Sequence, residues 1–414
     1  MPEKNKKQLK ILVLTHLFSD IAVGGEARAV WGFTNALAEI GLDVYVVSSF
    51  VETVERNYHP KIKVYQVPFP KRRTNFCQLD MFKTFLYALP IIFLKKIDII
   101  HLMPTQGPHP YAYFKIRPFV STVDVNWNYE DTKFRDDLIY DRRQKREELG
   151  LLEKEYDFFD KVIGKLAYYF FKIFRMNQEL PKSVDLCAYR HIKLLDWFKK
   201  EKYPSQFVYI PVGVDTNMFS PVVKTIFSKK ENLTFLFIGS VAKRKGVEYL
   251  LRAFNILSQK YTNIELLIVG PGAPATIDFF KKVIEPTAKV KFLGQATGYN
   301  LVRYYNCADV FVSPSVGIDL GINKSVVEAM ACAKPVIVSR AHDTGVIDNK
   351  GGFSFEPGNI NQLAEVMEKF IKNPALIESM GKTAREYVLK NHDWIILAQR
   401  MKDAYQKLLI NYLK

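Results

Sequence analysis

Short runs of consecutive apolar residues alternate with longer stretches of helical periodicity along the first part of the chain. Ile11–Thr15 is such a run, a helical pattern follows over Ala29–Ile40, and Val44–Ser48 is the next run. Continuous apolar runs of this length are typical of strands buried on both faces of a parallel sheet. Gly41 stands where the helical pattern stops, as expected of a helix end. The pattern therefore predicts a strand–helix–strand unit at the start of an α/β domain.

The same alternation continues and then starts again in the second half of the chain. Asp98–Leu102 and Phe119–Val123 extend the first series, and a helix over Val247–Tyr261 belongs to the second. The strands predicted for the second series are Thr234–Gly239, Leu266–Gly270, Val290–Leu293, Val310–Ser313 and Pro335–Ser339. A length of 414 residues also exceeds what one ordinary core supports. We therefore predict an α/β protein of two Rossmann-like, doubly wound domains, joined near Pro211–Asp215.

The composition is that of a soluble globular protein with a basic surplus. Hydrophobic residues make up 48% and charged residues 25% of the chain, and the formal net charge is +16. The surplus favours anionic partners such as nucleotide phosphates or acidic lipid headgroups, although a well-solvated surface explains it equally. No RRM, helix-turn-helix or zinc-finger pattern accompanies the charge, so we expect no nucleic-acid partner.

The cysteines and the apolar runs bear on the cellular compartment. Four scattered cysteines without a CxxC pair indicate a reducing compartment and no structural metal. The run Ile11–Leu14 is shorter than a signal peptide requires. The longest apolar runs, around Phe85–Leu94 and Leu166–Phe174, are too short to span a bilayer. We therefore expect a cytoplasmic protein, either free or peripheral on the inner face of the cell membrane.

Residues 158–176 combine aromatic and apolar side chains with four cations. On a helix these cations fall within a stripe about 80° wide. They are Lys161, Lys165, Lys172 and Arg175. Such a segment either packs against the first sheet or lies in a membrane interface, with its cations toward headgroups or an acceptor. The nearby clusters Lys71–Arg73 and Lys95–Lys96 add positive charge, which is in keeping with the membrane interpretation, and both interpretations stay open.

Two glycines, Gly24 and Gly25, lie between the first predicted strand and the first predicted helix. Without Cβ atoms, the turn lets backbone N–H groups approach a ligand, and the helix N-terminus adds a partial positive charge that suits phosphate. Many strand-to-helix turns contain glycine, however. This motif alone does not distinguish a phosphate site from an ordinary turn.

A cluster of three cations follows the first predicted strand of the second domain. Lys243, Arg244 and Lys245 stand at the carboxyl end of that strand, where open α/β sheets bind ligands. A lysine supplies a point charge to a diphosphate, and an arginine binds two of its oxygens at once. A solvated basic turn is the alternative. The position after the strand favours an anion site.

A third motif is a glycine-bearing loop, Leu320–Asn323, that enters a helix. The amides of Gly321 and Ile322 are candidate donors at the helix start. Glu328, on the helix itself, is a candidate acceptor for the two hydroxyls of a ribose, as acidic residues are in dinucleotide-binding folds. An ordinary exposed helical glutamate is the alternative for Glu328.

One further glycine pattern resembles a dinucleotide-binding loop but lacks features that such a loop needs. Gly270–Ala275 matches the G-x-G-x-x-A pattern of dinucleotide-binding loops. Pro271 and Pro274 remove N–H donors that such a loop needs, and no acidic residue stands near the expected distance downstream. We therefore expect a turn beside the ligand site rather than a nicotinamide site.

Taken in chain order, these segments resemble the family 4 retaining glycosyltransferases over nearly the whole sequence. The opening strand, Gly-Gly loop and helix are similar to the family's start, and its inter-domain signature resembles YIPVGVDTNMFSP. The second half adds FLFIGSVAKRKGVEYLLRAF, LLIVGPG, VKFLGQATGYNLVRYYNCADVFVSPS and SVVEAMACAKPVIVS in the expected order and spacing. The ordered set carries the resemblance more than any single motif does.

The resemblance implies a GT-B fold, in which two Rossmann-like domains face a central cleft. The acceptor-side domain would span residues 1–212, the nucleotide-sugar domain would span 213–394, and a helix over 395–414 would pack back on the first domain. It implies transfer of a sugar from a nucleotide sugar with retention at the anomeric carbon. The basic aromatic segment 158–176 points to a glycan acceptor that is lipid-linked or lies at a membrane surface. No metal and no cofactor are expected, in keeping with the lack of an Asp-x-Asp at a strand end.

The resemblance also implies roles for particular residues. Lys245 would stabilise the leaving diphosphate, Glu328 would hold the ribose, and Asp124 would lie near the sugar as an orienting group or an acid/base. The leaving phosphate would take the acceptor's proton, so no protein nucleophile is required. The expected donor-binding residues are Gly24, Gly25, Ser240, Arg244, Lys245, Asp319, Gly321, Ile322, Asn323, Lys324 and Glu328. Those expected near the nucleobase are Gly270, Leu293 and Gly294.

Three positions depart from the family pattern. Leu320 stands where a glutamate is usual, with Asp319 adjacent. Ser240 replaces a usual arginine, with Arg244 four residues on, and Asp124 replaces a common histidine. Nucleotide and diphosphate binding therefore look intact, whereas the contacts to the sugar are changed. A non-catalytic nucleotide-sugar or lipid-binding protein on the same scaffold is the alternative function, and the retained diphosphate and ribose residues argue against it.

Overall fold

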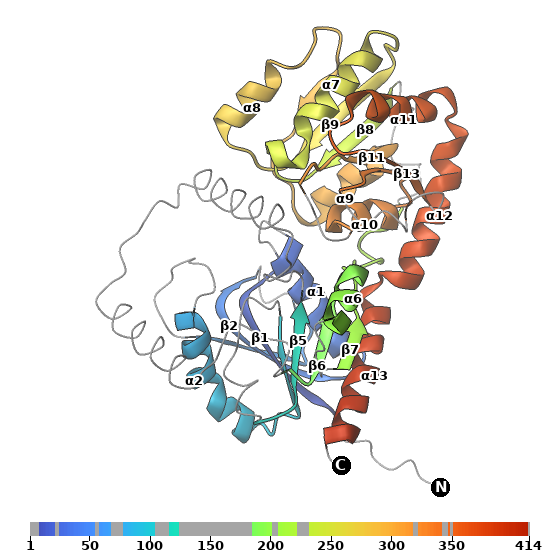
Figure 1. Cartoon of the computed structure of the whole chain (residues 1–414). Helices are drawn as coiled ribbons and strands as arrows, with labels where there is room; N and C mark the ends of the chain where they lie inside the picture. The colour runs from blue at the N-terminus through green and yellow to red at the C-terminus, as the bar shows by residue number, and fades with distance from the viewer. Residues whose placement is uncertain are drawn as a thin grey trace. The chain divides into compact units, whose positions relative to one another are not determined.

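The computed structural model describes residues 8–20, 25–53, 58–67, 78–103, 116–123, 184–200, 206–221, 232–317, 322–341, 347 and 351–412. The described residues form two compact units (Figure 1). The chain passes from the first unit to the second between Gly213 and Val214, within the segment predicted as the junction. It returns to the first unit between Asp393 and Trp394.

The first unit is built on a seven-stranded parallel sheet in the order β3-β2-β1-β4-β5-β6-β7. Its strands are β1 (Lys10–Ser19), β2 (Asp43–Glu52), β3 (Ile62–Gln66), β4 (Ile99–Leu102), β5 (Phe119–Val123), β6 (Leu186–Tyr189) and β7 (Gln206–Tyr209). The helices described in it are α1 (Gly25–Glu39), α2 (Gln78–Leu94), α6 (Ile192–Lys200) and α13 (Trp394–Tyr412). The strand order reverses between β1 and β4, the kind of switch point that doubly wound sheets share.

Side chains of β1 alternate between two covered faces of this sheet. Ile11 and Val13 pack in one core with α1 and α13, whereas Leu12 and Leu14 pack in another with α2. All four side chains are fully buried. Because helices cover both faces, the strand is apolar throughout, which explains the continuous apolar run in the sequence.

The last helix, α13, is part of the first unit and is held there by packing and by a buried hydrogen-bond chain. Trp394 packs against Gly32, where a Cβ atom would overlap the indole ring. Deeper in the unit, His101 of β4 lies between two hydroxyls. Its Nδ1 is 2.5 Å from Tyr405 Oη on α13, and its Nε2 is 2.7 Å from Thr122 Oγ1 on β5. These two hydrogen bonds thus join α13 to the central strands β4 and β5.

The buried His101 makes the first unit sensitive to acid. Burial lowers the pKa of His101 from 6.5 to about 3, and the nearby Arg190 adds a smaller effect in the same direction. The folded unit therefore needs the neutral ring, so its contribution to stability is complete above pH 6.5 and is lost as the pH falls toward 3. We expect this residue alone to lower the free energy of unfolding by about 2 kcal/mol between about pH 8 and pH 5.

Urea unfolding followed by tryptophan fluorescence measures this pH dependence. The His101→Gln variant keeps hydrogen-bonding groups but does not titrate in this range. It should be less stable at neutral pH and should lose the part of the acid sensitivity that belongs to the ring. An unchanged slope of stability against pH in the variant would contradict the assignment.

The second unit is built on a six-stranded parallel sheet in the order β10-β9-β8-β11-β12-β13. Its strands are β8 (Leu233–Ile238), β9 (Ile264–Val269), β10 (Val290–Phe292), β11 (Val310–Ser313), β12 (Val336–Ser339) and β13 (Gly352–Phe355). Its helices are the 3-10 turn η3 (Lys243–Lys245), α7 (Val247–Ser258), α8 (Pro274–Lys281), α9 (Gly298–Cys307), α10 (Lys324–Ala331), α11 (Ile360–Lys372) and α12 (Ala375–Asn391).

Helices α7 and α11 close the main core of the second unit. Phe235 and Phe237 of β8 are buried in one cluster with Phe254 of α7 and with Leu363 and Met367 of α11. α7 and α11 lie side by side (Figure 1). The sheet of the second unit is thus covered by amphipathic helices, as the repeated strand–helix pattern predicted.

Hydrogen bonds join the beginning and the end of the second unit. Val214 N donates to the His392 carbonyl at 2.8 Å, and the Thr216 hydroxyl donates to the Asp393 carboxylate. Arg385 of α12 donates to the main chain of the same entering segment. The two points at which the chain enters and leaves this unit are therefore bonded to each other.

The predicted fold class is confirmed, and most of its strands lie where the apolar runs stand. Phe119–Val123 and Val310–Ser313 are strands with the predicted bounds. The predicted start of the first helix at Ala29 is wrong, since α1 begins four residues earlier, at Gly25. The pattern also does not predict β3, β6, β7 and β13. Polar residues interrupt the apolar runs of β3 and β13, and β3, β7 and β13 lie at sheet edges.

Candidate functional site

The turns after β8, β9 and β10 meet at the carboxyl edge of the second sheet. The amide of Gly270 donates to the Gly294 carbonyl at 2.7 Å. Gly270 has a φ of +144°, and a Cβ atom there would overlap the Gly239 carbonyl oxygen. Only glycine fits this close approach of two main chains. The contact brings Ser240, next to Gly239, to the same edge as Leu293 and Gly294.

The three-cation motif forms the short turn η3 at this edge, directly after β8. Gly246 ends the turn in the left-handed conformation, with a φ of +73°, and a Cβ atom there would overlap the Pro314 carbonyl oxygen after β11. The amide of Val316 donates to the Arg244 carbonyl at 3.0 Å. The basic turn is therefore fixed against the loop that follows β11 and leads toward α10.

The three cations of η3 differ in their surroundings. Lys243 is exposed, and its Nζ lies 5.0 Å from the ring centroid of Phe279 on α8. This cation–π contact directs it toward α8. Arg244 and Lys245 are half-buried. These two, rather than Lys243, are the candidates for binding an anion at the carboxyl edge.

Glu328 lies on α10, the helix that begins after the next loop, and its side chain is only 1% exposed. The hydroxyl of Tyr305 on α9 donates to its Oε2 at 2.8 Å, and Lys324 Nζ lies 3.9 Å from its Oε1. A buried carboxylate is stable only when it is paired and hydrogen-bonded. The alternative that Glu328 is an ordinary exposed residue is therefore wrong.

Comparisons with known proteins find similarity over this part of the chain. The model of the family described as glycosyl transferases group 1 matches residues 232–373, which include the whole carboxyl edge described above. The second unit carries a glycosyl transferases group 1 domain. The resemblance to family 4 glycosyltransferases indicated by the motifs is thereby confirmed.

Two relatives and one solved structure show how far the similarity extends. The chain is 29% identical to the Staphylococcus aureus capsular polysaccharide biosynthesis glycosyltransferase CapM over 43% of this chain, which spans 47% of the relative's length. It is 24% identical to the Acholeplasma laidlawii alpha-monoglucosyldiacylglycerol synthase over 87% of this chain and 88% of that protein. The Thermosynechococcus elongatus sucrose-phosphate synthase superposes with a TM-score of 0.69 at 19% identity, covering 97% of this chain and 100% of the other. The last comparison supports a fold of two Rossmann-like α/β domains.

The glycosyltransferase domain contains most of the predicted donor residues that the structure describes. Ile322 and Asn323 directly precede α10, and Asn323 is its N-cap residue. Gly25 is the first residue of α1 in the first unit. Several predicted residues lie outside the described ones, namely Gly24, Asp124, Asp319, Gly321, Lys161, Lys165, Lys172 and Arg175. Their roles stay predictions.

Sequence reasoning missed two partners of the predicted residues in the glycosyltransferase domain. Tyr305 holds the Glu328 carboxylate, although the two stand 23 positions apart on different helices. Val316 holds the main chain of the basic turn through its amide. Neither contact has a signature in spacing, because each joins segments that only the parallel sheet brings together.

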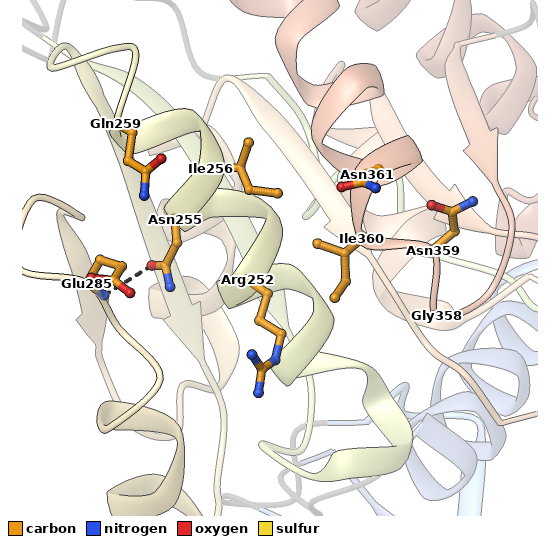
Figure 2. A pocket seen from close by; sticks show the side chains of 9 residues that line it. All are labelled: Arg252, Asn255, Ile256, Gln259, Glu285, Gly358, Asn359, Ile360 and Asn361. Carbon is orange, nitrogen blue, oxygen red and sulfur yellow. Dashed lines mark hydrogen bonds between the residues drawn. The ribbon is translucent and has the colours of Figure 1, made fainter.

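A hollow of the glycosyltransferase domain, about 550 Å³ in volume, lies between α7 and the start of α11 (Figure 2). Two of its polar side chains form hydrogen bonds to the main chain. Asn255 donates to the Val283 carbonyl and accepts from the Glu285 amide. Asn359 caps α11 by accepting from the Gln362 amide. None of the predicted site residues lines it.

Proposed function

We propose that this protein is a glycosyltransferase that takes a sugar from a nucleoside diphosphate and transfers it with retention at the anomeric carbon. One observation carries the proposal. The Arg244 carbonyl accepts the Val316 amide, so the basic turn and the loop toward α10 are fixed at one edge of the sheet. A cationic turn beside a helix start is the arrangement that binds phosphates in open α/β sheets.

In this proposal the second unit holds the donor. Arg244 and Lys245 neutralise the diphosphate, and the amides at the start of α10, with Asn323 and Lys324, contact its oxygens. Glu328 accepts hydrogen bonds from the ribose diol, with Tyr305 fixing its Oε2. The residues at the turns after β9 and β10 border the nucleobase.

The proposed reaction forms one bond and breaks one. The acceptor hydroxyl oxygen bonds to the anomeric carbon, while the bond from that carbon to the diphosphate oxygen breaks. The leaving diphosphate carries away the electron pair and takes the acceptor's proton. Asp124 orients the sugar or the acceptor hydroxyl in this scheme, which requires no metal. The task of the basic turn is to stabilise the charge that grows on the leaving group.

For the acceptor we propose a lipid-linked or membrane-surface glycan. The Acholeplasma relative, similar over most of the chain, is named for a glucosylated diacylglycerol, and the Staphylococcus relative for a capsular polysaccharide. Both names point to acceptors or products at a cell surface or membrane. The net charge of +16 suits an approach to anionic lipid.

A thermal-shift screen with UDP, GDP, ADP and their sugar conjugates tests the donor assignment. One nucleotide series should stabilise the protein, by about 2.7 kcal/mol at a ligand concentration of 100 times Kd. Glu328→Gln should reduce the shift, because a neutral amide is a weaker acceptor for the ribose diol. The exposed Glu365 of α11 gives a matched control, and Glu365→Gln should shift as the wild type does.

The screen also separates the proposal from its rival. If no nucleotide stabilises the wild type, the donor assignment fails. If nucleotides stabilise it but no sugar is released from any conjugate, the non-catalytic binding protein is the better description. The anomeric proton coupling of a released product, measured by NMR, tests retention.

A further inference from the structure

The helix α2 of the first unit turns an apolar stripe toward solvent. Leu86, Phe93 and Leu94 are 51%, 57% and 78% exposed, and Pro90 between them is also exposed. They stand at positions i, i+4, i+7 and i+8 of one helix. At about 100° per residue they share a stripe about 100° wide. A surface helix normally carries polar residues there.

The stripe is not the core face of α2. The core face is formed by other residues of the helix, including Phe85, Ala88 and Ile92, which are buried against the sheet of the first unit. Helix α11 of the second unit gives the contrast. Its exposed residues are Asn361, Glu365, Lys369 and Lys372, all of them polar. The outward face of α2 is therefore apolar, and the packing of α2 against the described residues of the first unit does not explain this character.

Cations gather at the C-terminal end of the stripe. Lys95 and Lys96 follow α2 directly and are exposed. Lys10 Nζ donates to the Lys95 carbonyl at 3.1 Å, which brings a third ammonium group there. The guanidinium carbon of Arg117 lies 5.9 Å from the ring centroid of Phe93. Asp98 is the acid nearest in sequence, and it accepts from the Lys10 amide.

We propose that α2 docks the protein on an anionic lipid bilayer, with the stripe in the boundary between headgroups and acyl chains. Apolar side chains beside long-stemmed cations are what such a boundary accepts, since the ammonium groups reach the headgroups while their stems stay with the apolar chains. Four side chains are too few for a stable protein interface, which needs about 800 Å² on each partner. Among the described residues, no helix is long and apolar enough to cross a bilayer.

This surface lies on the first unit and uses none of the donor residues. The inference therefore stands whether or not the acceptor is a lipid. Its test is binding to vesicles without any nucleotide, which keeps its outcome separate from that of the donor screen.

Sedimentation with vesicles of phosphatidylcholine, with and without phosphatidylglycerol, measures the docking. The wild type should bind the anionic vesicles, and the binding should weaken as salt screens the cations. The double variant Phe93→Ser/Leu94→Ser should bind at least about tenfold more weakly. Lys95→Glu/Lys96→Glu should lose a similar factor on anionic vesicles, because it removes two attractive charges and adds two repulsive ones.

Because the substituted side chains are exposed, these variants should keep the fold, and their melting midpoints check this. Tyr299 of the second unit, 81% exposed, supplies the matched control, and Tyr299→Ser should bind vesicles as the wild type does. Equal vesicle binding by the wild type and the α2 variants would overturn the proposal. So would a wild-type dimer in sedimentation velocity that the Phe93→Ser/Leu94→Ser variant dissociates, because the stripe would then be covered by a second copy.

Discussion

The Lys245→Ala variant is expected to lower kcat/KM for the nucleotide-sugar donor by about 100- to 1,000-fold. The side chain stands on η3, half-buried at the carboxyl edge of the second sheet, in a turn held by the contact between Val316 and the Arg244 carbonyl. The charge on the diphosphate grows as its bond to the sugar breaks, so a fixed cation stabilises the transition state more than the bound donor. Release of nucleotide from the donor measures the effect.

Two further variants separate the charge of Lys245 from its place in the fold. Lys282→Ala removes an exposed lysine that follows α8 in the same unit, and it should leave the rate unchanged. Lys245→Arg keeps the charge with a different shape and should recover part of the activity. If Lys245→Ala has the same melting midpoint and the same activity as Lys282→Ala, Lys245 does not belong to the proposed site.

The sequence predicted the architecture well because the physics that sets it is local. A strand covered by helices on both faces is mostly apolar, and β11 (Val310–Ser313) therefore stands out by three consecutive apolar residues. Edge strands are less constrained. β3 has the sequence IKVYQ, in which Lys63 and Gln66 are exposed, and no periodic signal distinguishes it from a loop.

The candidate site could be predicted only in part, since its residues come from separate strands. The position of Lys245 follows from one rule, that ligands bind at the carboxyl ends of parallel strands. The burial of Glu328 does not follow from any local rule, because its partner Tyr305 is on another helix. Likewise, the apolar run Phe85–Leu94 does not reveal which of its residues remain exposed. That depends on how α2 packs against the sheet.

Gly246→Ala is expected to destabilise the second unit by about 3 kcal/mol or more. Two costs add at this position. The φ of +73° is in the left-handed region, which strains any residue with a Cβ atom. The new methyl group would also overlap the Pro314 carbonyl oxygen, which belongs to the backbone and cannot move alone. The turn η3 or the loop after β11 must therefore shift, and the contact of the Arg244 carbonyl with Val316 would weaken.

Gly298→Ala separates these two costs. Gly298 has a φ of +55°, and nothing lies within 4 Å of a Cβ atom there. Its variant should therefore lose only about 1–2 kcal/mol from the strained backbone. Urea unfolding of both variants measures the difference, which belongs to the overlap with Pro314. The donor screen adds a functional readout, since Gly246→Ala should lose the nucleotide-induced shift and Gly298→Ala should keep it. If the two variants have equal stability and an equal nucleotide response, the basic turn does not depend on its packing against the loop after β11. The proposed diphosphate site would then lack the contact that is thought to fix it.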